Sequence, residues 1–515
     1  MTNRLSLLTL LFFLFYGCDN SNSTTSSDSN TTRITGKILY ERINPLHSDS
    51  SSLLNRNNIT PEPSSGIIVE AIDSDGATLA STTTNNQGEY TFGQLPRNTS
   101  LKIRAYAKIF KANQWEVKVI DNTNSNSIYV IEGSLTNSGE SNSIRNLTAS
   151  ASNRSSGPFA ILASVYKAMN LVYKVDNSVK LPKLLINWSV NNIPSDGSLS
   201  DGQIGTSFFN GLNNIYILGD QNSDTDEFDN HVVIHEWGHF LEKTLSRADN
   251  IGGQHGEGDN LDIRVAFGEG FGNAFSAIVT DDPIYFDTYG RAGQSGWNMN
   301  IEETEHVNPG WSSEASVQRI LYDLYDNHDD GADKLTFGFK PLYEVLTKEQ
   351  KSAKAFTSIF SFISELKNRN STKSNEIDAI VSSEDIATIT DIYGSNRDNN
   401  LQSGTLPIYE QITIGESLNL CTTNFYGSPN KVNNHKYVRL AIPSSDIYTI
   451  RVAKSHGSIA DFNFELFNTT PFQSQFLAEG QGDESRDLSL SKGEYLLDIY
   501  NVQYSSRACF DVSIN

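Results

Sequence analysis

The chain has 515 residues, which is enough for about three domains at roughly 150 residues each. Hydrophobic residues make up 37% of it, so the composition excludes a wholly disordered chain. Acidic residues number 61 against 39 basic ones, and the formal net charge of −22 argues against a nucleic-acid partner, because no surplus of positive charge is available to displace counterions from phosphates.

The N-terminal segment predicts export. Arg4 precedes a mostly apolar run from Leu5 to Tyr16, which is too short to span a bilayer and is typical of a signal peptide. Gly17-Cys18 ends the run, and residues 19–32 are rich in Ser, Asn and Thr. This arrangement resembles the lipobox of bacterial lipoproteins, which implies a signal peptide over 1–18, a lipid on Cys18 that binds the membrane, and a polar tether over 19–32. The implied location is the cell envelope, at the outer membrane or cell surface, and ordinary secretion is the alternative.

Residues 33–150 predict a β-rich block. Short runs of β-branched residues alternate with turns, for example at 34–40 and 66–72. The stretch from Thr82 to Pro96 resembles the hairpin of carboxypeptidase regulatory-like domains. The resemblance implies a β-sandwich that serves as an accessory module and contains no active site.

The pattern changes twice after this block. Residues 151–400 combine helical periodicity with strand-like runs, which predicts an α+β domain. Residues 406–515 return to short alternating strands and resemble the C-terminal β-sandwich of many secreted bacterial peptidases. Because an exported protein can form disulfides, we expect Cys421, near the start of this block, to pair with Cys509 in its last strand.

The sequence His235-Glu236-Trp237-Gly238-His239 predicts a metal site. Only three cysteines occur in the chain, so His, Asp and Glu must provide the ligands of any metal ion. On a helix, His235 and His239 lie on one face and can bind the same ion, while Glu236 lies beside the ion and can take a proton from water. The alternative interpretation is a surface helix with two exposed histidines.

A third ligand is predicted at Glu269. This residue lies in a helical pattern between Gly268, Gly270 and Gly272, although each glycine costs about 1 kcal/mol relative to alanine in a helix. Three such glycines indicate that this helix packs closely against the first one, which would bring the carboxylate to the metal. A catalytic zinc ion takes three protein ligands and keeps a fourth position open.

Together the two motifs resemble the gluzincin metallopeptidases, and the Gly-Glu-Gly-aromatic form is most similar to the fungalysin-like branch. The resemblance covers about residues 210–330 and implies a zincin-type fold. It also implies one zinc ion on His235, His239 and Glu269, with Glu236 as the general base. A metzincin would need a histidine where this chain has Leu245. An aspzincin would use an aspartate, for which Asp259 and Asp262 are available without a glycine-framed helix.

Further residues take their expected roles from this resemblance. The family usually has an aspartate where this chain has Asn273, which implies a weaker zinc ligand set. His306 is the first candidate for stabilising the oxyanion of the reaction, and three tyrosines are its rivals: Tyr289, Tyr322 and Tyr325. His255, on a glycine-rich loop, is interpreted as substrate-facing or incidental rather than as a ligand.

Two features near the motif leave alternatives open. The strand predicted at 213–218 is expected to lie at the edge of the cleft and to pair with the substrate main chain, with an interior strand as the alternative. Two acidic loops, at 220–229 and 326–333, could each hold Ca²⁺, but solvated loops are the favoured interpretation.

The sequence therefore predicts a multidomain protein with an N-terminal β-sandwich, a central α+β domain of the zincin type and a C-terminal β-sandwich. The predicted function is that of an extracytoplasmic zinc metalloendopeptidase acting on proteins or peptides. An adhesion or matrix-binding lipoprotein that uses the peptidase fold as a scaffold is the alternative. A scaffold has no need of Glu236, so the intact motif favours the enzyme.

Overall fold

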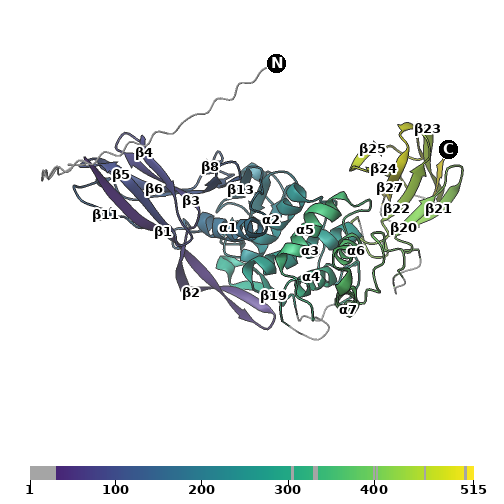
Figure 1. Ribbon diagram of the computed structural model, residues 1–515, viewed down its shortest axis with the longest axis horizontal. Helices are drawn as coiled ribbons and strands as arrows, with labels where there is room; N and C mark the ends of the chain where they lie inside the picture. The colour runs from purple at the N-terminus through teal and green to yellow at the C-terminus, as the bar shows by residue number, and fades with distance from the viewer. Residues whose placement is uncertain are drawn as a thin grey trace, which may run out of the picture.

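The computed structural model describes residues 30–302, 307–328, 334–397, 401, 404–427, 429–457, 460–503 and 507–515. The molecule is elongated, with β-rich parts at its two ends and most of the helices between them (Figure 1). The described residues contain several β-sheets and seven α-helices, as expected for a multidomain chain of mixed class. Within these residues, no helix has both the length and the apolar character needed to cross a membrane. Cys18 and the predicted signal peptide lie outside the described residues.

Two sheets form the N-terminal part, and their buried side chains belong to one hydrophobic cluster. Residues of the first strand alternate between buried and more exposed positions from Thr32 to Tyr40, because one face of the strand packs on the core. The first sheet consists of β1 (Thr31–Ser48), β2 (Ser51–Pro63), β5 (Glu89–Pro96), β11 (Ser143–Ile144) and β12 (Leu147–Ala149). The second sheet contains β3 (Ile67–Asp73), β4 (Thr78–Thr83), β6 (Ser100–Lys111) and β7 (Trp115–Asp121), with the short strands β8 (Ser127–Ile128), β9 (Val130–Glu132) and β10 (Thr136–Asn137).

The second sheet continues into the central part of the chain. Its strand β7 pairs in parallel with β13 (Leu184–Trp188), followed by β15 (Asn214–Ile217) and then β14 (Phe208–Phe209). Parallel neighbours need a crossover connection, and α1 (Gly157–Val175) lies in the segment between β7 and β13. The expected domain boundary near residue 150 therefore does not separate two sheets, and the N-terminal part shares a sheet and a core with the central part.

The run predicted at 213–218 forms β15, which is an interior strand. It pairs with β13 on one side and with β14 on the other, and Ile215 and Ile217 are buried. The prediction of a cleft-edge strand here is wrong, because the two-residue strand β14 folds back along β15 and takes the end position of the sheet.

The central part contains the remaining helices and a small sheet. The helices are α2 (Asn230–Leu245), α3 (Ile263–Thr280), α4 (Glu314–Asp323), α5 (Phe339–Glu344), α6 (Ile359–Arg369) and α7 (Ser374–Ser383). The small sheet consists of β16 (Gly219–Asp220), β17 (Asp224–Thr225), β18 (Ile284–Tyr289) and β19 (Ser295–Asn300). Helix α3 contacts both α2 and α4, and β2 of the N-terminal part reaches β18 and β19.

Only the first of the two acidic loops differs from the favoured prediction of solvated loops. In 220–229, Asp226 and Asp229 are buried, so this loop is not simply solvated. In 326–333, residues 329–333 lie outside the described residues, and His328 Nδ1 lies 2.6 Å from Glu302 Oε1.

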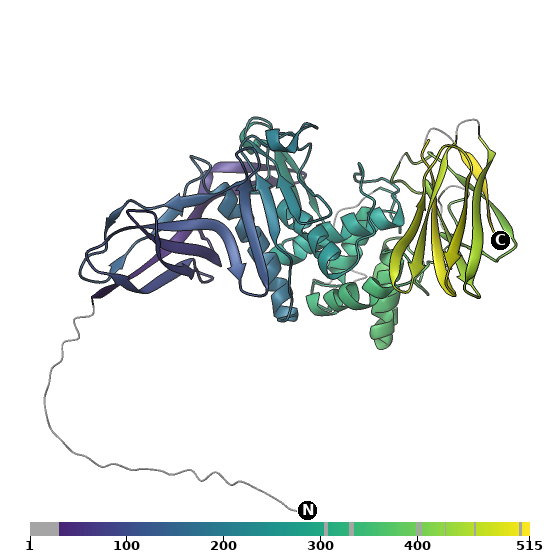
Figure 2. The ribbon, with the colours of Figure 1, turned by 90° about the horizontal axis from the view of Figure 1, so that it is seen from above.

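The C-terminal part consists of two sheets with a hydrophobic cluster of their own, seen at one end of the molecule in Figure 2. One sheet contains β20 (Tyr409–Ile412), β22 (His435–Ile442), β24 (Phe462–Thr469), β25 (Phe472–Ala478) and β27 (Gly493–Asn501). The other contains β21 (Ser417–Thr422), β23 (Asp446–His456), β26 (Glu484–Leu490) and β28 (Ala508–Ile514). Cys421 and Cys509 lie directly opposite each other on β21 and β28 and form a disulfide, which confirms the predicted pairing.

Candidate metal centre

Helix α2 carries the His235–His239 motif. It begins after Asp229, but the Asp229 carboxylate does not cap the helix. Instead it accepts hydrogen bonds from the N–H and the hydroxyl of Thr288, at 2.7 and 2.9 Å. Thr288 lies on β18, so this contact ties the start of α2 to the β18–β19 hairpin.

Helix α3 brings Glu269 close to α2 because its glycines lack side chains that would keep the helices apart. A Cβ atom on Gly272 would lie 2.8 Å from the His235 ring, and one on Gly270 would lie 2.6 Å from Val317 of α4. Both distances are too short for a real Cβ atom. The glycine pattern thus lets α3 fit between α2 and α4, as the sequence predicts.

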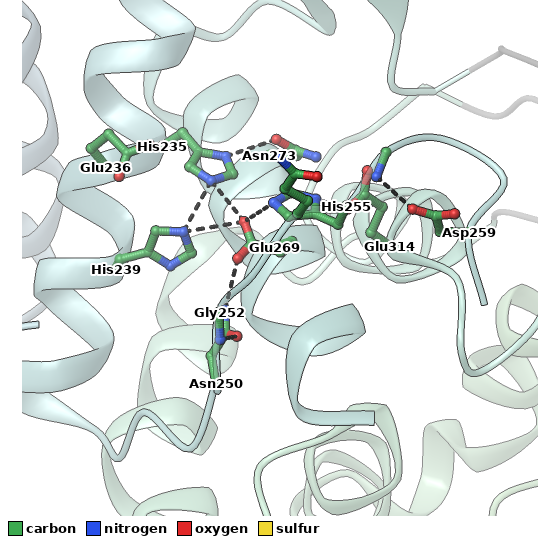
Figure 3. Close-up of polar contacts among 12 residues, drawn as sticks. His235, Glu236, His239, Asn250, Gly252, His255, Asp259, Glu269, Asn273 and Glu314 are labelled. Atoms are coloured by element: carbon green, nitrogen blue, oxygen red, sulfur yellow. Dashed lines mark hydrogen bonds and ion pairs between the residues drawn. The ribbon is translucent and has the colours of Figure 1, made fainter. Parts of the chain in front are cut away.

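The side chains of His235, His239 and Glu269 point toward one another (Figure 3). The Nε2 atoms of the two histidines lie 3.0 Å apart. Glu269 Oε2 lies 3.2 Å from His235 Nε2 and 3.3 Å from His239 Nε2. The structure therefore brings the three predicted ligands together, with one donor atom from each close enough to contact a single cation.

Asn273 orients the ring of His235. The Nδ1–H of His235 donates a hydrogen bond to Asn273 Oδ1 at 2.8 Å, and the Asn273 amide donates to Gln318 Oε1 at 2.8 Å. A neutral imidazole with its proton on Nδ1 presents Nε2 as the metal-binding atom. Asn273 therefore orients the ring of His235 without adding a charge.

His235, His239 and Glu269 are called the trio below. The second and third of them also have polar neighbours. Asn250 donates a hydrogen bond to Glu269 Oε1 at 2.8 Å, so Oε2 is the atom that faces the histidines. Glu242, one turn after His239 on α2, places Oε2 3.5 Å from His239 Nδ1. Neither Asn250 nor Glu242 belongs to the motif, so no sequence pattern marks them and only the packing places them here.

Glu236 lies beside the trio and is held by the edge strand of the large sheet. Its Oε2 accepts a hydrogen bond from the backbone N–H of Phe209 in β14 at 2.7 Å. Burial raises the pKa of Glu236, and the neighbouring histidines oppose that rise. A carboxylate in this position can exchange a proton with a reactant between α2 and β14.

His255 lies next to His235, His239 and Glu269. Its Nε2 is 3.3 Å from Glu269 Oε2, and its Nδ1 is 2.7 Å from Glu314 Oε2 at the start of α4. Burial opposes protonation of His255, but Glu314 and Glu269 raise its pKa to about 9. The residue therefore belongs to the polar surroundings of the candidate centre.

The residue predicted to stabilise the oxyanion is not described by the structure. His306 is not among the described residues. Of its rivals, Tyr322 and Tyr325 pack in the hydrophobic core and contact each other, as expected for core aromatics at helical spacing. Tyr289 is 46% exposed at the end of β18.

The charges of the trio favour a bound cation. Burial opposes ionisation of Glu269, but His239, His235 and His255 hold its pKa well below its usual range. Burial would lower the pKa of His239, yet Glu269 and Glu242 raise it well above its usual range. The buried carboxylate thus requires positive charge next to it, which either a proton or a metal ion can supply. Two imidazole nitrogens and one carboxylate are a ligand set that catalytic zinc ions use, so the residues fit zinc.

One family model matches the chain. Residues 173–382 match the family described as Mycolysin C-terminal domain. No curated protein matches the chain.

Comparison with solved structures gives only weak similarities. The pre-peptidase C-terminal domain of a collagenase from Bacillus anthracis is 12% identical, covering 23% of this chain and 100% of that chain with a TM-score of 0.18. PliG, a periplasmic lysozyme inhibitor from Aeromonas hydrophila, is 17% identical, covering 21% of this chain and 99% of that chain with a TM-score of 0.15. At these TM-scores neither similarity carries a conclusion. The family match alone relates the segment that holds the candidate centre to a peptidase-associated domain.

Proposed function

We propose that this chain is an extracytoplasmic zinc-dependent endopeptidase. The observation that carries the proposal is the convergence of His235 Nε2, His239 Nε2 and Glu269 Oε2 within 3.3 Å of one another, beside a carboxylate that is not part of the trio. Zinc held by these residues supplies Lewis-acid activation of water at neutral pH. The family match over 173–382 supports the same assignment.

Glu236 acts as the general base. It follows His235 directly, so its carboxylate lies next to the ligands rather than among them. The Phe209 N–H holds Oε2, which leaves Oε1 to take a proton from the attacking water and pass it to the leaving amine. A fixed carboxylate performs this transfer without reorganising at the moment of reaction.

The edge strand β14 positions the substrate. It lies at the end of the large sheet and pairs only with β15 among the described strands. An extended peptide can add to such an edge through main-chain hydrogen bonds. Because Phe209 of β14 also contacts Glu236, a peptide bound along this edge lies close to the base.

Two histidines, His306 and His255, are assigned the role of stabilising the developing oxyanion. His306 takes this role from the resemblance to the gluzincins. His255 takes it from geometry, because Glu314 fixes its ring and its Nε2 lies next to Glu269. An imidazole N–H aimed at the oxyanion stabilises the transition state more than the ground state.

The enzyme is anchored to the cell envelope through a lipid on Cys18. The predicted polar tether, residues 19–32, then links the membrane to the N-terminal sheets, and its last two residues already belong to β1. Proteins or peptides outside the cytoplasm are the substrates.

The test compares zinc content and peptidase activity of the purified chain and its variants. Wild-type protein should bind one zinc ion and cleave casein, and chelation should abolish the cleavage. Glu236→Gln should keep the zinc and lose activity by several orders of magnitude, because the ligands remain and the base does not. Glu269→Ala should lose the zinc as well.

The same assay separates the two histidines and the alternative function. The histidine that donates to the oxyanion is identified by its alanine variant. That variant, His255→Ala or His306→Ala, should lower kcat by about 10²–10³-fold and still bind zinc. Glu269→Ala that binds zinc as tightly as wild type would contradict the ligand assignment. Zinc binding without any hydrolysis would favour the scaffold alternative.

A further inference from the structure

A second cluster of carboxylates lies beside the start of α2, away from the candidate zinc ligands. It consists of Asp224, Asp226 and Asp287, and one oxygen atom of each lies within 4.8 Å of the others. Asp224 and Asp226 point to one side because side chains alternate along an extended segment. Asp224 pairs with Tyr289 of β18 in antiparallel register, and continuing that register by two residues sets Asp226 opposite Asp287.

Buried oxygen atoms of this cluster lack hydrogen-bond partners. Asp226 is 3% exposed, and although its Oδ2 accepts a hydrogen bond from the Ser207 hydroxyl, its Oδ1 is buried without a partner. Asp224 Oδ1 is also buried without a partner. Two arginines contact this loop. Arg154 pairs with Glu227 at 2.6 Å, and Arg42 donates hydrogen bonds to Asn230 Oδ1 at 2.6 Å and to the Phe228 carbonyl at 3.3 Å. A buried carboxylate without a counter-charge is strongly unfavourable, so this arrangement needs either protons or a cation.

The titration behaviour of the cluster agrees with this geometry. Burial, together with the charge of Asp287, raises the pKa of Asp224 to about 7. Burial raises the pKa of Asp287 to about 6. The carboxylates therefore resist ionisation when nothing positive lies between them.

We propose that Asp224, Asp226 and Asp287 bind a calcium ion. Two oxygen atoms that each lie about 2.4 Å from Ca²⁺ are at most about 4.8 Å apart, so a single ion can contact all three carboxylates. The cluster offers oxygen atoms only, whereas zinc prefers nitrogen and sulfur ligands. Three carboxylates favour Ca²⁺ over Mg²⁺, which usually keeps several waters and binds one or two carboxylates. Asp224 and Asp287 are partly exposed, so water can complete the coordination.

The ion would fix the position of α2, the helix that carries His235 and His239. The cluster joins β17, the segment before α2, and β18. Asp229, in the same segment, already binds Thr288 of β18. A calcium ion would add a second tie between α2 and the β18–β19 hairpin, whether or not the chain is a peptidase.

The test uses the full chain after chelator treatment, with one equivalent of zinc restored, and titrates it with CaCl₂ by calorimetry and by thermal unfolding. One Ca²⁺ should bind per chain and raise the thermal midpoint by several degrees. Asp287→Asn and Asp226→Asn should weaken calcium binding at least 10-fold. Each should also raise the midpoint of the calcium-free protein, because one repelling charge is gone. Asp220→Asn is the matched control: Asp220 accepts hydrogen bonds from Asn222 and Ser223 in the same loop and lies outside the cluster.

Several results would overturn the proposal. One is the absence of calcium binding and of any thermal shift at about 1 mM CaCl₂, the upper end for extracellular sites. Another is an equal loss of binding in Asp220→Asn. Equal or tighter binding of MgCl₂ would overturn the assignment to calcium. None of these results bears on zinc content or on casein cleavage, so failure here is distinct from failure of the proposed function.

Discussion

Gly272 is the glycine of α3 that lies against the predicted ligand His235. A Cβ atom at this position would meet the His235 ring at 2.8 Å, so only glycine lets the ring keep its contact with Asn273. Gly238, on the facing side of α2, is different. A Cβ atom there would lie 3.4 Å from Phe275 and 3.5 Å from the Gly272 Cα atom, which are ordinary contacts.

This difference predicts opposite effects of two similar substitutions. Gly272→Ala should displace the His235 ring and weaken zinc binding about 10-fold or more. Gly238→Ala should keep zinc affinity and stabilise α2 by up to about 1 kcal/mol, because alanine is the better helix former. Competition with a chromophoric chelator measures the affinity, and thermal unfolding measures the stability. Wild-type zinc affinity in Gly272→Ala would contradict the position of the ring.

At the scale of secondary-structure elements, a buried ionic network ties the start of α3 to the C-terminal part. Arg264, in the first turn of α3, donates to Asp498 Oδ2 of β27 at 2.7 Å and to Asp262 Oδ1 at 2.9 Å. His435 of β22 lies 2.7 Å from Asp498 Oδ1. The helix that carries Glu269 is thus fixed at its N-terminal end by residues of the neighbouring sheets.

Removal of one partner should leave a buried charge without compensation. Asp498→Ala should lower the free energy of unfolding by about 3–5 kcal/mol. Glu494→Gln is the matched control on the same strand, because the pair of Glu494 with Lys354, at 2.6 Å, is exposed and should contribute at most about 1 kcal/mol. Urea unfolding measures both values, and equal losses in the two variants would contradict the role of the buried network.

The effect of Asp498 should also depend on pH. Burial opposes ionisation of Asp498, but Arg264 and His435 hold its pKa at about 2. Because the folded-state pKa lies below the usual value of 3.8, the stabilisation is present above about pH 4 and is lost as the pH falls toward 2. The difference between wild type and Asp498→Ala should therefore shrink over that interval.

At the scale of the whole molecule, the candidate centre lies between the two β-rich ends (Figure 1). In chain order, the N-terminal sheets come between the predicted tether and the central helices. As a random coil, the thirteen residues from Cys18 to Asn30 would have a root-mean-square span of about 20 Å. A lipid on Cys18 would therefore leave the candidate centre accessible to large substrates outside the membrane.

This arrangement predicts that anchoring and catalysis are separable. Cys18→Ser should move the protein from the detergent phase to the aqueous phase in a phase-partition experiment, because the acyl chains are lost. The rate of casein cleavage should not change, and Ser23→Ala, in the same tether, should leave the partition unchanged. Wild-type protein found wholly in the aqueous phase, cut elsewhere than before Cys18, would favour ordinary secretion.

The sequence by itself determined features that lie within one element. The pairing of His235 with His239 on one helix face follows from their spacing, and the close approach of α3 follows from its glycines. Helix α1 and strand β13 lie within 151–400, where the sequence predicts helices and strands, because their apolar periodicity is local. The pairing of Cys421 with Cys509 also followed, since they are the two cysteines that remain once Cys18 is set aside.

Only the tertiary structure decided which distant segments meet. Nothing in the local pattern of β7 shows that Val117 pairs with Leu184, so the shared sheet was missed. The interior position of β15 depends on the two-residue strand β14, which is too short to produce a pattern. The contact of His255 with Glu269 and the meeting of Asp226 with Asp287 likewise join segments that are far apart in sequence. Periodicity reports which face of an element is buried, but the partner on that face is chosen by the packing of the whole chain.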